Sequence, residues 1–247
     1  MQRIPLPDRL DTLITAHCSP EWRKLMEQRT TVLHFAQGEQ LFKEKQPADQ
    51  LYIMRTGKAK VHSSFEPGST RILRFARDGQ VLGHRGIGMD FTYTVSATAL
   101  TDCVVEMIPL PLFLEVLRDN ADFSFHFMLF MAEELRRSEE QAKNLMNMTV
   151  LQRVAKALRA TADCFGFDPD DKNLLAFTPS RRDLADYAGA TYESTIRAVT
   201  ELQKKKVIKT VGREIRIVNG KGLQALLKQP ALPVFPAPLR PARGGLQ

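Results

Sequence analysis

The 247-residue sequence has little cysteine and no long apolar run. Its three cysteines, Cys18, Cys103 and Cys164, are far apart and form no C-x-x-C pair, which excludes a cysteine zinc site and a disulfide framework. The longest apolar run, residues 127–132, is too short to span a bilayer, and no basic-then-apolar leader opens the chain. We therefore expect a soluble cytoplasmic protein with no metal site and no membrane contact.

The motifs of common enzyme classes are missing as well. The five histidines never form the H-x-H pair that a metal-dependent cupin barrel needs, and no nucleophile elbow, P-loop or G-x-G-x-x-G fingerprint occurs. Gly83, Gly86 and Gly88 follow a β-rich segment but open no helix, so we interpret them as a turn. The sequence predicts a protein that is not an enzyme, with a cupin-type metal enzyme as the alternative from another class.

The net charge of +7 is unevenly distributed along the chain. Residues 1–149 hold 18 Lys/Arg and 19 Asp/Glu (18 − 19 = −1), whereas residues 150–229 hold 15 and 9 (15 − 9 = +6). Arg240 and Arg243 supply the remaining surplus. A basic segment is suited to neutralising phosphates and releasing their counterions, although a solvated basic face without a partner has the same composition.

The first half of the chain is typical of an antiparallel β-protein. A helix beginning at Pro20 is followed by short β-rich runs with Gly, Pro and Asp-Gly punctuation at regular spacing, which favours an antiparallel barrel or jelly roll. The strands are expected at residues 31–35, 40–42, 50–54, 58–63 and 71–75, and between 93 and 108 with an interruption.

A long helix is predicted over residues 122–148, after a short one at 112–117. It carries two apolar faces. One, formed by Phe123, Phe127 and Phe130, is expected to pack on the β-domain. The other steps by three and four residues and predicts a homodimer seam, with a buried helix in a monomer as the alternative. The seam residues are Met128, Met131, Leu135, Ser138, Ala142 and Leu145, and the charges that favour a solvent-flanked seam are Glu133, Glu134, Arg136, Arg137, Glu139 and Glu140.

Residues 178–218 have the pattern of a winged helix-turn-helix. Ser180 is a good N-cap with Asp183 three residues later, Gly189 can end the first helix in a left-handed conformation, and Thr191 can cap the second. Two β-rich runs follow, with Gly212 at the tip between them. Such a unit is suited to placing its second helix in a DNA major groove, although a small helical hairpin without function shows similar spacing.

Three sequence motifs in the first half of the chain point to a particular family: QGEQLF at 37–42, PADQLYIM at 47–54 and TGKAKV at 56–61. They look like the opening of a cyclic-nucleotide-binding β-roll. With the helix-turn-helix downstream, residues 15–220 resemble the Crp/Fnr superfamily of bacterial transcription regulators. The fold class is therefore expected to be α+β. The expected parts are a β-roll sensor domain (1–121), a dimerisation helix (122–148), a winged helix-turn-helix domain (149–229) and a disordered Pro-rich tail (230–247).

The resemblance implies double-stranded DNA, a second copy of the chain and RNA polymerase as partners. It places base reading at Tyr192, Glu193, Ser194 and Arg197, and phosphate contacts at Ser180, Arg181, Arg182, Thr191, Gly212 and Arg213. Arg197 can donate two bonds to guanine, and Glu193 can accept from cytosine or pair with Arg197 across one helical turn. The resemblance implies that both roles of Glu193 coexist, with the ion pair holding Arg197 in position. Ile196 either touches a thymine methyl or packs inward, and Tyr192 stands where many relatives have arginine, so the preferred half-site is not carried over.

The effector is not implied by the resemblance. Members that bind cAMP use a Gly-Glu pair for the ribose and an Arg-Ser pair for the cyclic phosphate. Here His84 falls at the glutamate and Tyr93 at or near the arginine, which predicts no tight binding of cAMP or cGMP. The candidates for an effector pocket are His84, Arg85, Tyr93 and Thr94.

Other cofactors find little support in the sequence. The iron–sulfur branch needs an N-terminal cysteine cluster, of which Cys18 alone is present. Haem ligation by His17 or His84 stays open, although a lone histidine is more often structural. No cofactor is therefore predicted. A dimeric DNA-binding repressor or architectural protein without ligand control remains the alternative function. The operator, the effector and the choice between activation and repression are not defined by the sequence.

Overall fold

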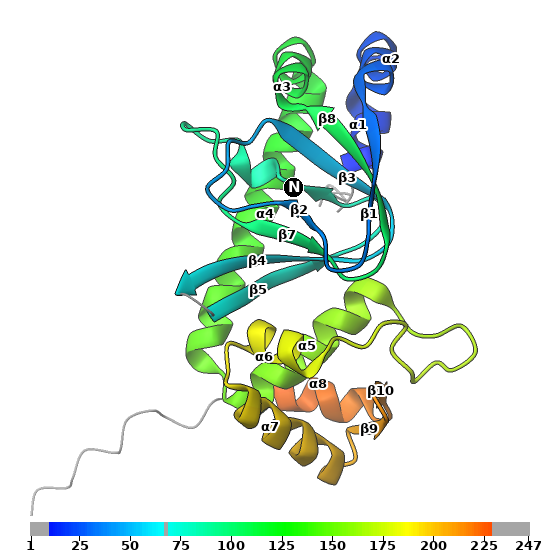
Figure 1. The fold of residues 1–247 in the computed structure, drawn as a ribbon, viewed down its shortest axis with the longest axis vertical. Coiled ribbons are helices and arrows are strands. Elements are labelled where there is room, and N and C mark those ends of the chain that lie inside the picture. Colours follow the sequence, from blue (N-terminus) through cyan, green and yellow to red (C-terminus); the bar gives the residue numbers. More distant parts are fainter. Residues whose placement is uncertain (1–9, 67–68, 229–247) are drawn as a thin grey trace, which may run out of the picture.

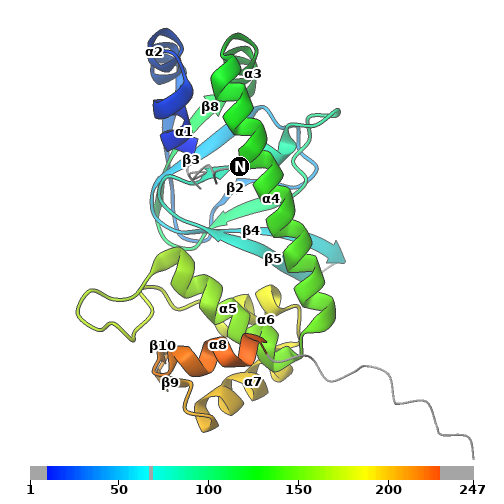
Figure 2. The same ribbon diagram turned by 180° about the vertical axis from the view of Figure 1, so that it is seen from behind.

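The computed structural model describes residues 10–66 and 69–228, without the side chains of residues 65, 66, 144 and 145 (Figure 1). The proline-rich tail predicted to be disordered lies outside these residues. A β-roll occupies one half of the molecule and a small helical domain the other, while one long helix runs along the β-roll toward the helical domain (Figures 1 and 2). The predicted α+β class is confirmed.

The β-roll consists of two four-stranded antiparallel sheets, with strand orders β1-β8-β3-β6 and β2-β7-β4-β5. All six predicted β-regions are strands, and the short β6 was not predicted. Gly57 (φ 104°) turns β3 into β4 in close contact with Asp102, because a Cβ there would lie 2.5 Å from the Asp102 carbonyl oxygen. The strands are β1 (Thr31–Phe35), β2 (Gln40–Phe42), β3 (Gln50–Thr56), β4 (Ala59–Glu66), β5 (Ser69–Ala76), β6 (Val81–Leu82), β7 (Ser96–Ala99) and β8 (Cys103–Pro109).

Four helices cover the β-roll: α1 (Leu10–His17), α2 (Pro20–Arg29), α3 (Leu110–Asp119) and α4 (Ala121–Asn147). Pro20 begins α2 as predicted, and the Ser19 side chain accepts from the Trp22 amide. Phe123, Phe127 and Phe130 of α4 are buried in the β-roll core, which confirms the predicted packing of this face. Phe113 of α3 meets the rings of Phe123 and Phe127 edge-on at centroid distances of 5.9 and 5.2 Å.

The second domain packs three helices and a two-stranded wing around α5 (Val150–Phe165). Thr149 and Gln152 form a capping box at the start of α5, which separates this helix from α4. Apolar residues of every element meet in one core that includes Leu158, Leu184, Leu202 and Ile215, all fully buried. The other elements are α6 (Arg181–Ala188), α7 (Tyr192–Lys204), β9 (Ile208–Val211), β10 (Glu214–Ile217) and α8 (Gly220–Lys228). Within the described ranges, no helix is both long and apolar enough to cross a membrane.

An aromatic cluster joins the two domains. Phe75 of β5 stacks on Tyr187 of α6 with ring centroids 5.3 Å apart and contacts Phe165 at the end of α5 at 5.6 Å. Ile72 and Leu100 complete the buried centre of this cluster on the β-roll side. Burial raises the pKa of Tyr187 to about 12, so its hydroxyl stays protonated at neutral pH.

Two basic side chains of the β-roll also contact α6 and the turn after it. Lys60 of β4 donates to the Asp183 carboxylate at 2.6 Å, and both side chains are largely buried. Arg71 of β5 lies against the backbone of Gly189, where a Cβ would be 2.1 Å from the guanidinium. The β-roll therefore contacts the helix-turn-helix at its first helix and at its turn.

We expect Phe75→Ala to lower the free energy of unfolding by about 3 kcal/mol and to loosen the domain junction, because it leaves a cavity between Tyr187 and Phe165. Urea denaturation measures the loss, and limited proteolysis between the domains measures the loosening. Phe167→Ala removes the same atoms from an exposed position of the second domain and serves as the control. Equal stability of the two variants would contradict the assignment of this junction.

Candidate nucleic-acid interface and effector cavity

The helix-turn-helix is built by three local devices that the sequence predicts. The Ser180 hydroxyl accepts from the Asp183 amide at 3.0 Å and starts α6. Gly189 adopts the left-handed conformation (φ 55°, ψ 53°) that ends α6. The Thr191 hydroxyl accepts from the Ser194 amide at 3.2 Å and starts α7. These caps fix the angle between two short helices without any ligand.

The second helix, α7, has one buried and one exposed face. Ala198, Val199 and Leu202 are buried in the domain core. The outward side of its first two turns carries Tyr192, Glu193 and Arg197, all exposed, and it lies at the end of the molecule opposite the β-roll helices (Figure 1). The structure thus brings the four candidate base-reading residues onto one accessible surface, with Ser194 half-buried among them.

Arg197 is held by Ser194 in the structure. Its Nη2 donates to Ser194 Oγ at 3.0 Å, and Thr191 Oγ1 donates to the same oxygen at 3.0 Å. Of the two roles considered for Glu193, the ion pair with Arg197 is not formed among the described side chains. The guanidinium is positioned by a chain of hydroxyls that begins at the helix cap, and it keeps donors free for an acceptor on a partner.

The neighbouring positions of α7 have different environments. Thr195 is fully buried and its hydroxyl has no hydrogen-bond partner among the described residues, so it packs as an apolar residue would. Ile196 is 36% exposed, so it belongs to the accessible surface as well as to the edge of the core. Of the two roles left open for Ile196, contact with a partner is therefore sterically accessible.

The candidate phosphate contacts surround this surface. Ser180 and Arg182 are exposed at the start of α6, where Arg182 pairs with Asp186 at 3.2 Å. Arg181 is half-buried, and burial lowers the pKa of its guanidinium, which stays charged at neutral pH. Gly212 turns the wing with φ 59°, and the adjacent Arg213 is exposed. Donors thus lie on both sides of α7, as a curved phosphate backbone requires.

The predicted dimer seam divides into two rows on α4. Met128, Leu135 and Ala142, spaced by seven residues, form an exposed row, in which Met128 is 56% and Leu135 61% exposed. Met131 and Ser138 are half-buried and face the β-roll core and a cavity, respectively. The side chain of Leu145 lies outside the described residues. The exposed row is the part of the seam that a second copy can reach.

A cavity of about 780 Å³ lies where both domains meet α4. Val61, Leu73 and Arg74 of the β-roll line one wall, and Ser138 and Gln141 of α4 line another. Ala160, Cys164 and Tyr187 close it on the side of the second domain. The cavity is thus lined by the β-roll, by α4 and by the helix-turn-helix domain.

Charged groups converge on Glu134 at the edge of this cavity. Arg85 donates to the Glu134 carboxylate at 3.2 Å, and His84 Nε2 lies 3.4 Å from it. Burial alone raises the pKa of Glu134, but the close approach of His84 and the positive charges of Arg74 and Arg85 outweigh burial and hold the pKa well below its usual range. Burial lowers the pKa of His84, so the imidazole is neutral at pH 7. Glu134 is therefore an ionised carboxylate neutralised by arginines.

The expectation that Glu134 flanks the seam in solvent is wrong, because its side chain is buried against the β-roll. Arg74, half-buried, donates to the Val81 carbonyl at 2.6 Å and was not singled out from the sequence. The signal that could have identified Arg74 is its position as a charged residue between apolar residues of the strand β5. Both residues belong to the group that defines the polarity of the cavity.

The four candidate effector residues do not share one environment. Arg85 lines the cavity, and His84 is buried behind it against Phe130. Tyr93 is buried in the β-roll core, where its hydroxyl donates to the Gln50 carbonyl at 2.8 Å, and Thr94 is exposed. Burial raises the pKa of Tyr93 far above its usual range. The described lining of the cavity therefore includes one of the four.

We expect Glu134→Gln to lower the free energy of unfolding by about 3 kcal/mol at pH 7, because it leaves Arg74 and Arg85 without their buried counter-charge. A carboxyl whose pKa is lower in the folded state contributes this stabilisation fully above its unfolded value of 4.5, and the stabilisation decreases progressively as the pH falls below 4.5 toward the folded value. Urea denaturation from pH 7 down to pH 3 measures both effects.

The matched control is Glu133→Gln, which removes the adjacent carboxylate from partly exposed pairs with Arg136 and Arg137. We expect a loss below about 1 kcal/mol for this variant. A loss for Glu134→Gln that stayed constant from pH 7 to pH 3 would show that Glu134 is not the ionised centre of the cluster.

Comparisons with known proteins agree with this architecture. Residues 32–120 match the family model of the cyclic nucleotide-binding domain, and residues 152–226 match that of the Crp-like helix-turn-helix domain. Electron transport regulator A of Shewanella oneidensis is 28% identical over 189 residues, which cover 76% of this chain and 75% of that protein. The transcriptional regulatory protein btr of Bordetella pertussis is 25% identical over 244 residues, covering 92% and 98%.

Among solved structures, that of FixK2 from Bradyrhizobium japonicum has the same fold, with a TM-score of 0.70 at 24% identity over 80% of this chain and 96% of that one. The two family models match the β-roll and the helix-turn-helix domain of this chain, respectively. The chain belongs to the Crp/Fnr family of DNA-binding transcription regulators.

Proposed function

We propose that the protein acts in the cytoplasm as a homodimer that reads a two-fold symmetric DNA site with the exposed face of α7. The observation that carries this proposal is Arg197, whose guanidinium is exposed and held by the hydroxyl of Ser194. A held guanidinium can donate two bonds to the O6 and N7 atoms of one guanine. Glu193 and Tyr192 lie beside it on the same turn and contribute the remaining base contacts.

The phosphate contacts come from Ser180, Arg181, Arg182 and Thr191 on one side of α7 and from Gly212 and Arg213 on the other. These groups set the register of the protein on DNA, whereas the α7 residues choose the sequence. Contact with RNA polymerase completes the proposed action on transcription. In this function the protein regulates transcription and catalyses no reaction.

We further propose that the effector, where one is used, is not cAMP. Four arginines line the cavity, Arg74, Arg77, Arg85 and Arg137, and two of them, Arg85 and Arg137, already pair with Glu134 of the same chain. A cyclic phosphate entering the cavity has to compete with this carboxylate for Arg85. DNA binding is then either controlled by another ligand in the cavity or independent of any ligand.

The exposed row on α4 supports the homodimer. Met128 and Leu135 present large apolar surface on a helix whose opposite face is buried, and such surface on a regulator is typical of an interface. Two copies related by a two-fold axis along this row place their α7 helices for two half-sites of a palindrome. The half-buried Met131 and Ser138 then face the β-roll and the cavity of their own chain.

DNA selection by the ligand-free, full-length protein from a randomised duplex pool tests the reading helix. We expect enrichment of a palindrome, and loss of about 1–3 kcal/mol of discrimination at one base position in Arg197→Ala. Arg159→Ala, which removes an exposed arginine of α5 paired with Asp163, is the control and leaves the selection unchanged. Enrichment of the same palindrome by Arg197→Ala and wild type would contradict the assignment of the reading helix.

The same selection with cAMP or cGMP present tests the effector. Enrichment that depends on either nucleotide would overturn the interpretation of Glu134 as the occupant of the arginine site. Binding at two salt concentrations separates the contacts, because Arg213→Ala is expected to reduce the salt slope by about 1 while leaving the selected sequence unchanged.

Leu135→Asp is expected to weaken the dimer at least tenfold, because it places a charge in the exposed apolar row of α4. Sedimentation over a concentration series measures the dissociation constant. Val32→Asp makes the same change at an exposed apolar residue of β1 and is expected to leave the dimer intact. An unchanged dimer in Leu135→Asp would place the interface elsewhere.

A further inference from the structure

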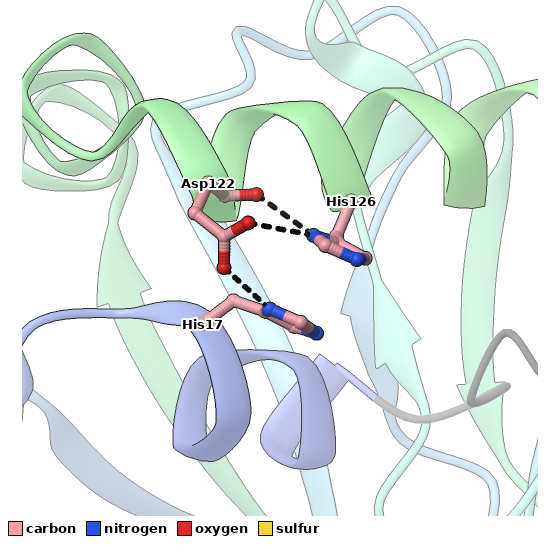
Figure 3. Close-up of side chains that lie close together, drawn as sticks. All are labelled: His17, Asp122 and His126. Atoms are coloured by element: carbon pink, nitrogen blue, oxygen red, sulfur yellow. Dashed lines mark hydrogen bonds and ion pairs between the residues drawn. The ribbon is translucent and has the colours of Figure 1, made fainter. Parts of the chain in front are cut away.

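Two histidines and one aspartate converge between α1 and the start of α4 (Figure 3). His17 is the last residue of α1, while Asp122 and His126 stand one turn apart on α4. Residues four apart on a helix point to the same side, so both α4 side chains face His17. The potential ligand atoms of the three residues all lie within 4.8 Å of one another.

Both imidazoles turn their Nδ1 edge toward the same carboxylate (Figure 3). His17 Nδ1 is 2.6 Å from Asp122 Oδ2, and His126 Nδ1 is 3.5 Å from Asp122 Oδ1 and 2.9 Å from the Asp122 main-chain oxygen. The two rings are stacked, with centroids 3.5 Å apart and planes 14° from parallel. The stack holds two nitrogen donors side by side over one pair of oxygens.

These separations are close to those of a metal site. Ligand atoms bound at about 2.0–2.1 Å in a tetrahedral arrangement lie about 3.3 Å apart, and the nitrogen–oxygen distances of 2.6 and 3.5 Å lie on either side of this value. Because the rings are stacked nearly parallel, binding of one ion requires them to rotate so that both Nδ1 lone pairs point toward it. Two imidazoles with one carboxylate suit divalent transition metals such as Zn²⁺ rather than Mg²⁺ or Ca²⁺.

The surroundings leave room for an ion and for its remaining ligands. The His17 and His126 side chains are mostly buried, at 24% and 16% exposure, whereas Asp122 is 66% exposed. The imidazoles are therefore held by packing, and water reaches the carboxylate side to fill an open coordination position. Binding leaves each ring neutral when its proton moves, through water, from Nδ1 to Nε2.

We propose that His17, Asp122 and His126 form a divalent transition-metal site that fastens α1 to the N-terminal end of α4. The site joins residues 105 positions apart in the sequence. It lies at the opposite end of α4 from the helix-turn-helix domain (Figure 2), so the proposal does not depend on the DNA-reading residues or on the nature of the effector. An ion here stabilises the start of the helix whose exposed row forms the proposed dimer seam.

The test is titration of the untagged, full-length, chelator-treated protein with Zn²⁺, with the binding measured by isothermal titration calorimetry. We expect one ion per chain, and affinity at least tenfold weaker in His17→Gln, His126→Gln and Asp122→Asn. The last variant keeps the size of an exposed side chain and guards against effects of misfolding. His34→Gln, at an exposed histidine of β1 outside the cluster, is the matched control and is expected to bind as wild type.

Co²⁺ in place of Zn²⁺ gives a second readout. We expect visible absorption bands that disappear in Asp122→Asn and contain no thiolate charge-transfer band, because the neighbouring Cys18 is buried and outside the cluster. Zn²⁺ is also expected to raise the unfolding temperature of the wild type and of His34→Gln only. No binding by the wild type, or equal binding by the wild type and the three cluster variants, would show that the cluster is only a hydrogen-bonded link between the helices.

Discussion

The contact of Phe75 with Tyr187 and Phe165 is the interaction on which the two-domain arrangement depends. It buries aromatic surface between a strand of the sensor and two helices of the reading domain. Lys60 and Asp183 add a largely buried ion pair beside it. Asp183 has a second role, because its main-chain amide takes part in the cap that starts α6. Lys60 of β4 is therefore linked directly to the first turn of the helix-turn-helix.

The long helix α4 is the other physical link between the halves of the molecule. Its aromatic face is fixed in the β-roll core, and Glu134 ties it to the segment around His84 through Arg85. The cavity next to Glu134 is lined by β-strands, by α4 and by the second domain. The β-roll, α4 and the helix-turn-helix domain therefore share one set of contacts. In this arrangement, a shift of α4 by a side-chain length changes the environment of all three.

Much of the fold was predictable because it is specified locally. Ser180, Gly189 and Thr191 define the helix-turn-helix within twelve residues, and the strands follow from β-rich runs between turn residues. The α8 helix was not predicted, because Gly220 and Gly222 disguise its first turn. The exposure of the reading helix also followed from its apolar spacing, since Ala198, Val199 and Leu202 define the opposite, buried face.

The contacts that the sequence did not reveal join distant residues. Lys60 and Asp183 are 123 positions apart, and His17 and Asp122 are 105 apart, so no local spacing marks either pair. Glu134 was assigned to solvent because it neighbours a seam of apolar residues, whereas its burial follows from Arg85 and Arg74 on another part of the fold. The environment of these side chains is determined by charge pairing with residues far away in the sequence. The periodicity of apolar residues along one helix contains no information on such pairing.

β5 is the edge strand of the sheet β2-β7-β4-β5, and it contacts α5 and α6 of the reading domain. Edge strands expose unpaired backbone groups that can recruit another chain into an intermolecular sheet. The reading domain therefore shields this edge while it is docked. A rearrangement that lifted α6 far from β5 would uncover a site for aggregation, which favours small rotations over wide opening as the way this molecule changes state.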